Sequence, residues 1–77
     1  MKETFKETVA SELRALRAKS DFSQKQVASL AGIDIMTVAR YENNSTSMQL
    51  DMLEKILSVY KIPLCIFFTS ISANTHN

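Results

Sequence analysis

The sequence predicts a compact all-α domain of five helices. Apolar residues recur every three or four positions along most of the chain, which is the spacing of a helix with one buried face. Four-residue capping patterns precede two of these stretches, and such patterns are typical of helix starts. With 77 residues and a hydrophobic content of 45%, the chain has enough apolar surface for one small core and little more.

The first helix is expected from about residue 5 to residue 19. Thr4 and Glu7 stand at the two ends of a capping box, and Ser20 and Asp21 follow the last helical turn. The face expected to be buried carries four apolar residues at helical spacing: Phe5, Val9, Leu13 and Leu16.

Two shorter helices are expected next, with a tight turn between them. A second capping box starts at Ser23 and places the beginning of one helix near Gln24, and Gly32 ends that helix. Asp34 is a favourable N-cap for the next helix, expected from Ile35 to about Asn43. The inward faces of the two helices are Val27, Ala28, Ala31, Val38 and Tyr41.

The C-terminal part of the chain predicts two further helices. One is expected over residues 49–60, and Pro63 would open a short fifth helix from Leu64 to about Thr69. We therefore expect one domain over residues 1–69 and a polar, flexible tail over residues 70–77. The apolar residues that define the fourth helix are Leu50, Leu53, Ile56, Leu57 and Tyr60.

The composition bears on partners and compartment. Net charge is only +1, so a nucleic-acid-binding protein of this composition must gather its positive charge on one face. One cysteine cannot form an internal disulfide, which suits the cytoplasm. The charged N-terminal residues lack the apolar segment of a signal peptide, and no apolar run is long enough to cross a membrane.

Enzymatic and cofactor-dependent functions are disfavoured. His76, the single histidine, has no metal-ligand partners at usable spacing, and Cys65 has no base near it in the sequence. A single glycine is incompatible with a phosphate-binding loop of the P-loop type. We expect no catalytic residue, no cofactor, no metal and no small-molecule ligand.

The stretch from Gln24 to Asn43 carries the clearest functional pattern. Ala28 is small where two helices would cross closely, and Gly32 permits a sharp turn between them. Ile33 and Val38 would fill the angle between the helices from inside. This spacing predicts a helix-turn-helix unit, whose second helix enters the major groove of DNA.

Several short pieces of this sequence match one known family together. They are Leu13-Arg14-Ala15-Leu16-Arg17, Phe22-Ser23-Gln24, Val27-Ala28, Ala31-Gly32-Ile33, Val38, Tyr41-Glu42-Asn43 and Leu53-Glu54-Lys55-Ile56. On these pieces, from about residue 13 to residue 68, the chain resembles the phage repressor and Cro family, also called the xenobiotic response element family. The resemblance implies a five-helix, lambda-repressor-like domain that regulates transcription, usually as a homodimer on a near-palindromic double-stranded operator. It also implies a structural ion pair between Arg17 and Glu42.

Side chains on the second helix of the unit are expected to meet DNA bases. Arg40 can donate two hydrogen bonds to guanine or contact a phosphate, and Thr37 can donate to a phosphate or touch a thymine methyl. Ile35 and Met36 stand where the family more often has polar residues. They can pack on thymine methyls; alternatively, one turns inward or meets a protein partner.

Backbone contacts to DNA are expected on either side of these bases. The resemblance implies that Gln24 and Asn43 contact the DNA backbone, and free amides at a helix start already attract phosphate. Lys25, Asn44 and Ser45 are further candidates. The loop after the third helix lacks the Lys or Arg that the family often has there, which predicts a shallow dependence of affinity on salt.

The fifth helix is expected to carry the dimer interface. Residues 64–68 are five apolar residues in a row, so one face can dock on the fourth helix while the other stays exposed and available for a partner. The resemblance implies a two-fold contact in this region, and its candidates are Cys65, Ile66, Phe67 and Phe68. The alternative is a small core that takes up all five. Cys65 is expected to be a buried small hydrophobic residue.

The sequence thus indicates a DNA-binding transcription regulator, acting as a repressor and a homodimer. Two alternatives share its fold: a restriction-modification controller protein, and the antitoxin of a toxin–antitoxin pair. A third alternative is a protein-interaction module without DNA binding, with Ile35 and Met36 as its contact patch. The weak net charge of +1 keeps this third alternative open.

Overall fold

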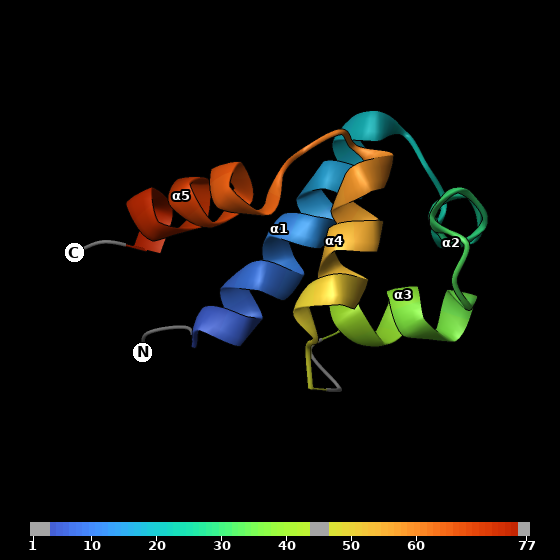
Figure 1. The fold of residues 1–77 in the computed structure, drawn as a ribbon, viewed down its shortest axis with the longest axis horizontal. Helices are drawn as coiled ribbons and strands as arrows, with labels where there is room; N and C mark the ends of the chain where they lie inside the picture. The colour runs from blue at the N-terminus through green and yellow to red at the C-terminus, as the bar shows by residue number, and fades with distance from the viewer. Residues whose placement is uncertain (1–3, 44–46, 76–77) are drawn as a thin grey trace.

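The computed structural model describes residues 4–43 and 47–75. Five helices account for most of these residues, and the described ranges contain no strand. The helices are α1 (Phe5–Ser20), α2 (Gln24–Ala31), α3 (Ile35–Glu42), α4 (Leu50–Val59) and α5 (Leu64–Thr75). The prediction of an all-α, five-helix domain is confirmed (Figure 1).

The helices begin where the capping residues lie. Thr4 accepts a hydrogen bond from the Glu7 N–H at 3.1 Å, and the Glu7 carboxylate accepts one from the Thr4 N–H at 2.8 Å. The second capping box, at Ser23 and Gln26, is closed in the same way before α2. Each box pairs two backbone N–H groups that a helix start leaves without partners. Both predicted capping boxes are confirmed.

Three of the helices end in one shared arrangement. After α1, α2 and α4 the chain takes the left-handed conformation at Asp21, Gly32 and Lys61, with φ of 60°, 70° and 59°. The next N–H in each case bonds back to the carbonyl five residues earlier. An apolar residue follows each turn and packs against the core: Phe22, Ile33 and Ile62. These turns redirect the chain and bury an apolar side chain at the same point.

The core draws on all five helices. α2 packs against α3 and α4, α1 packs against α3 and α5, and α4 packs against α5. α5 lies at one end of the long axis of the molecule, while α2 and the start of α3 lie at the other end (Figure 1). The buried apolar cluster consists of Val9, Leu13, Val27, Ala28, Val38, Tyr41, Leu53, Ile56, Leu57, Phe67 and Ile71.

The structure differs from the sequence-based prediction at two places around this core. α5 continues to Thr75 instead of ending near Thr69, because Ile71 lies one turn after Phe67 and is fully buried. The expected polar tail over residues 70–77 is therefore helical through residue 75. Phe5 was expected on the buried face of its helix, but it is 52% exposed, and Leu50, one of the residues that define the fourth helix, is 63% exposed. Each is the first residue of its helix.

Candidate nucleic-acid interface

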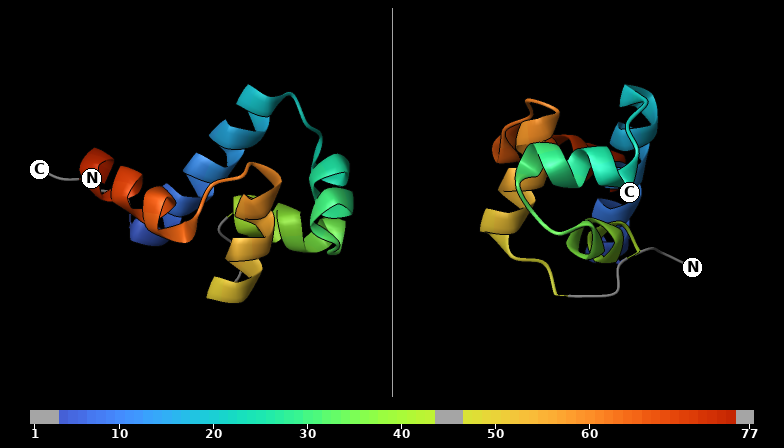
Figure 2. Two further views of the ribbon diagram at one scale, coloured as in Figure 1. Left: turned by 45° about the horizontal axis from the view of Figure 1, so that its top comes forward. Right: turned by 90° about the vertical axis from the view of Figure 1, so that its right-hand side faces the viewer.

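α2 and α3 form the corner that the sequence predicts. In the right-hand view of Figure 2, α2 runs across the picture and α3 is seen nearly end-on. Val27 and Val38 are fully buried between them, and Ala28 is also buried. At Gly32 no atom of the described residues lies within 4 Å of an added Cβ, while φ is +70°. The turn therefore needs glycine for its backbone conformation and not for lack of space.

α3 has one buried face and one exposed face. Val38, Tyr41 and Glu42 are buried. Met36, Arg40 and Asn43, spaced four and three residues apart, share the opposite, exposed face. The start of α3 lies at the end of the molecule farthest from α5 (Figure 1).

The side chains expected to meet DNA bases lie along this exposed face and its margins. Ile35 is 42% exposed and Met36 is 52% exposed, so neither turns into the core. Thr37 and Ala39 are half-buried on either margin of the face. The sequence-based prediction omitted Ala39, although its spacing of four residues from Ile35 would have placed it here.

Glu42, at the end of α3, is the centre of a buried polar network. Its carboxylate accepts from Arg17 Nε, which lies 2.9 Å from both Oε1 and Oε2. The Glu42 side chain is 3% exposed and the Arg17 side chain 26%. Arg14 Nη1 donates to the Glu42 backbone carbonyl, and Arg17 Nη1 donates to the Phe22 carbonyl at 3.2 Å. The geometry of the predicted Arg17–Glu42 pair is confirmed, and it ties α3 to α1.

Arg14 was not among the predicted residues. It precedes Arg17 by three positions, so both side chains emerge on the same side of α1. A cation at the C-terminal end of a helix is favourable, because the last carbonyls lack partners and carry partial negative charge. That spacing could have indicated its role.

Gln24, expected to contact the DNA backbone, is also part of this network. Its Nε2 donates to Glu42 Oε1 at 3.1 Å, and its side chain is half-buried. An amide nitrogen carries two hydrogens, so a phosphate contact would use the second one. The structure thus gives Gln24 a positioning role that the sequence did not indicate, because the two residues lie 18 positions apart.

Of the other four residues expected to contact the DNA backbone, the structure describes two. Lys25 and Asn43 are exposed, and Asn43 is the C-cap of α3. Asn44 and Ser45 lie outside the described residues. Past them, the Tyr41 hydroxyl accepts a hydrogen bond from the Gln49 N–H at 2.9 Å, which ties the start of α4 to α3.

Tyr60 lies close to the Arg17–Glu42 pair and packs on Phe22, with 6.3 Å between the ring centroids. Its hydroxyl is buried and has no hydrogen-bond partner among the described residues. Burial, with a smaller contribution from the Glu42 charge, raises the pKa of Tyr60 to about 12, although Arg17 acts in the opposite direction.

α5 divides the predicted interface residues between core and surface. Phe67 was expected at the dimer interface, but its side chain is buried and is not available to a partner. Cys65 is exposed, contrary to the expectation of a buried hydrophobic residue, because it lies about 200° around the helix from Phe67. Ile66 is 58% exposed. Phe68 is half-buried against Phe5 and Phe67, with 5.8 Å between ring centroids in both pairs.

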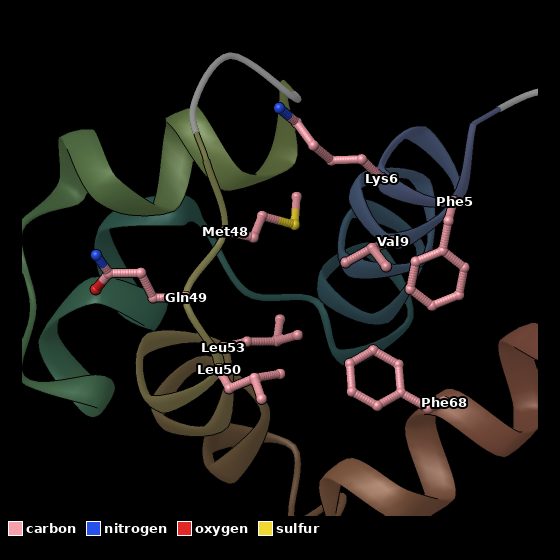
Figure 3. Close-up of a pocket in the computed structure, with 8 residues that line it drawn as sticks. All are labelled: Phe5, Lys6, Val9, Met48, Gln49, Leu50, Leu53 and Phe68. Atoms are coloured by element: carbon pink, nitrogen blue, oxygen red, sulfur yellow. The ribbon is translucent and has the colours of Figure 1, made fainter.

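An apolar hollow lies beside Phe68, where α1, α4 and α5 approach one another (Figure 3). Phe5 and Phe68 lie along one side of the hollow, and Leu50 and Leu53 project from α4 (Figure 3). The full lining is Phe5, Lys6, Val9, Met48, Gln49, Leu50, Leu53 and Phe68. Phe5 and Leu50, which are both exposed, thus border one feature.

Comparison with known families assigns the fold and the corner. A family model described as helix-turn-helix matches residues 13–67. The chain belongs to this helix-turn-helix family. The matched range contains α2, α3 and the whole Glu42 network, and it agrees with residues 13–68, over which the sequence resembles the phage repressor and Cro family.

Among curated proteins, a cryptic phage CTXphi transcriptional repressor, RstR of Vibrio cholerae, is 33% identical over 55 residues. The match covers 71% of this chain and 50% of the repressor, so this chain spans about half the length of that relative.

Solved structures show the same fold. The wild-type restriction-modification controller protein C.Esp1396I has a TM-score of 0.85 at 17% identity, covering 99% of this chain and 97% of that one. The same controller, as a tetramer with its natural 35 base-pair operator, also has a TM-score of 0.85 at 17% identity, covering 99% of this chain and 100% of that one. A transcriptional regulator from Vibrio cholerae has a TM-score of 0.75 at 27% identity, covering 91% of this chain and 37% of its own.

None of the helices in residues 4–43 and 47–75 combines the length and the apolar character that a membrane span requires. In the same ranges, no group of three or more His, Cys, Asp or Glu side chains could hold a metal ion.

Proposed function

We propose that this protein is a sequence-specific double-stranded DNA-binding transcription regulator that acts as a repressor. The exposed face of α3 carries the proposal: Arg40 and Met36 project from a helix whose opposite face is buried. A helix presented in this way fits the major groove, and an arginine on it can donate two hydrogen bonds to guanine. The likeness to a phage repressor supports the regulatory role. The protein would act in the cytoplasm of a bacterial cell.

The Glu42 network supports this proposal because it fixes the reading helix. Hydrogen bonds from Arg17 on α1 and Gln24 on α2 meet at one carboxylate on α3. Base recognition depends on side chains held in register with the base edges. A helix fixed from two neighbours loses less conformational freedom on binding than a mobile one would.

We further propose that the protein binds DNA as a homodimer through α5. Ile66 and Cys65 are exposed on this helix, and a large exposed aliphatic side chain on a short apolar helix favours a protein contact. α5 lies away from the start of α3 (Figure 1), so pairing through it would leave both reading helices open to DNA. A two-fold dimer would contact half-sites about one helical turn apart, roughly 34 Å.

Ile66→Glu tests the dimer. A charge in an apolar contact is costly to desolvate, so the variant should sediment as a monomer where the wild type is a dimer. Leu30→Glu is the matched control, because Leu30 is 63% exposed on α2 and should leave the dimer intact. An unchanged dimer in Ile66→Glu would contradict the assignment to α5.

Selection of bound sequences from a random double-stranded DNA pool tests the function itself. The proposal expects an enriched, near-palindromic motif with a guanine in each half-site. A pool that yields no motif with folded protein would contradict the proposal and would favour a protein-interaction module.

A further inference from the structure

We propose that Ile35 and Met36 recognise the C5 methyl groups of pyrimidines in the major groove. The preferred half-site then contains thymine, or 5-methylcytosine in its place, next to the guanine that Arg40 contacts. This inference rests on the proposed DNA-binding function and specifies which bases α3 prefers.

The exposure of these two side chains is the first support. Ile35 is 42% exposed and Met36 is 52% exposed, on the first turn of α3. Met36 precedes Arg40 by four residues, so the two side chains are neighbours on one face of the helix. A groove that receives Arg40 therefore also receives Met36.

The chemistry of the two side chains is the second support. Isoleucine has no hydrogen-bonding group, and the thioether of methionine is only a weak acceptor. Neither can use the polar pattern of the base edges. The methyl of thymine is the apolar group that an unmodified base pair presents in the major groove, so it is the feature these side chains can detect.

The same chemistry extends to modified cytosine. The methyl of 5-methylcytosine is attached at the same ring position as that of thymine. The two bases differ beside it, where thymine has an acceptor oxygen and cytosine a donor amine. Side chains that form no hydrogen bonds there cannot distinguish the two groups, so they should respond to both methylated bases.

The cap of α3 is the third support. The Asp34 carboxylate accepts from the Met36 N–H at 3.4 Å, which places a negative charge at the start of the helix. Such an end is a poor phosphate site, because the carboxylate repels the phosphate and occupies a donor. The α2 cap is formed by the neutral side chains of Ser23 and Gln26 instead. The start of α3 is thus better suited to base contacts by its exposed apolar side chains than to phosphate binding by its backbone.

Base analogues in the selected operator test this inference without altering the protein. Each thymine is replaced in turn by uracil, which lacks only the methyl, and the dissociation constant is measured by fluorescence anisotropy. Loss of one buried methyl should weaken binding about fourfold, which corresponds to ~0.8 kcal/mol. We expect this loss at one or two positions per half-site. At those positions 5-methylcytosine should bind more tightly than cytosine.

Protein variants then assign the effect to side chains. For each operator position, the affinity with thymine is divided by the affinity with uracil. Ile35→Ala and Met36→Ala should each reduce this affinity ratio toward one at a particular position. Leu30→Ala, which removes an exposed apolar side chain from α2, should keep the wild-type ratio. Thermal unfolding by circular dichroism confirms that each variant is folded.

The possible outcomes distinguish failure of methyl recognition from failure of the proposed DNA-binding function. A selected operator in which every thymine tolerates uracil would overturn the methyl recognition and leave the DNA-binding function standing. A methyl effect that survives in both alanine variants would overturn the assignment to Ile35 and Met36. Absence of any sequence-specific binding would overturn both the function and this inference.

Discussion

Removing Arg17 should destabilise the fold by more than the loss of an ordinary surface charge. In Arg17→Met the Glu42 carboxylate, whose side chain is 3% exposed, keeps only the Gln24 amide as a side-chain donor. Breaking one partner of a buried pair typically costs ~3–5 kcal/mol. Arg17 is itself 26% exposed and Gln24 remains as a donor, so we expect a loss below this range, about 2–3 kcal/mol. For a domain of this size that lowers the unfolding midpoint by about 10–20 °C.

Thermal and urea unfolding followed by circular dichroism measure this loss. Lys19→Met, an exposed cation at the end of the same helix, is the matched control and should change stability by less than about 0.5 kcal/mol. In Arg17→Met with Glu42→Met no stranded charge remains, so this double variant should be more stable than Arg17→Met alone. Equal effects of Arg17→Met and Lys19→Met would refute the argument, as would a double variant that loses the sum of both single effects.

Two further predictions concern stability. Gly32→Ala should cost about 1 kcal/mol by urea unfolding, because alanine disfavours φ of +70° while the space around it is open; a loss several times larger would indicate a steric clash instead. Tyr60→Phe should reduce the loss of stability at high pH. The pKa of Tyr60 is about 12 in the folded state and 10.0 in the unfolded state. The stability that its protonated hydroxyl contributes is therefore fully present below pH 10 and is lost as the pH rises toward 12. Urea unfolding of the wild type and of Tyr60→Phe across this pH range measures the effect. An equal dependence of stability on pH in the two proteins would contradict the assignment to Tyr60.

Local chemistry explains why much of this fold could be predicted from the sequence. Thr4 with Glu7, and Ser23 with Gln26, are contacts within one helical turn, so their residue types are sufficient to locate the helix starts. Gly32 likewise predicts the turn after α2, because few other residues accept the left-handed backbone conformation.

The missed features depend on neighbours distant in the sequence. Helical spacing gives the face on which Leu50 lies but not whether another helix reaches that far along α4. Ile71 sits in a polar segment, and its burial depends on the packing of α5 against α1 and α4. The bond from Gln24 to Glu42 joins α2 to the end of α3 and exists only once the corner has formed.

The exposed face of α3 is tested most directly by Arg40→Ala on two duplexes. One carries the selected operator and the other an unrelated sequence of equal length, and affinities are measured at the same salt concentration. If Arg40 reads a base, specific binding should fall by about 1–3 kcal/mol, roughly five- to 150-fold, while non-specific binding changes far less. An equal loss on both duplexes would make Arg40 a phosphate contact and would contradict base reading by this face of α3.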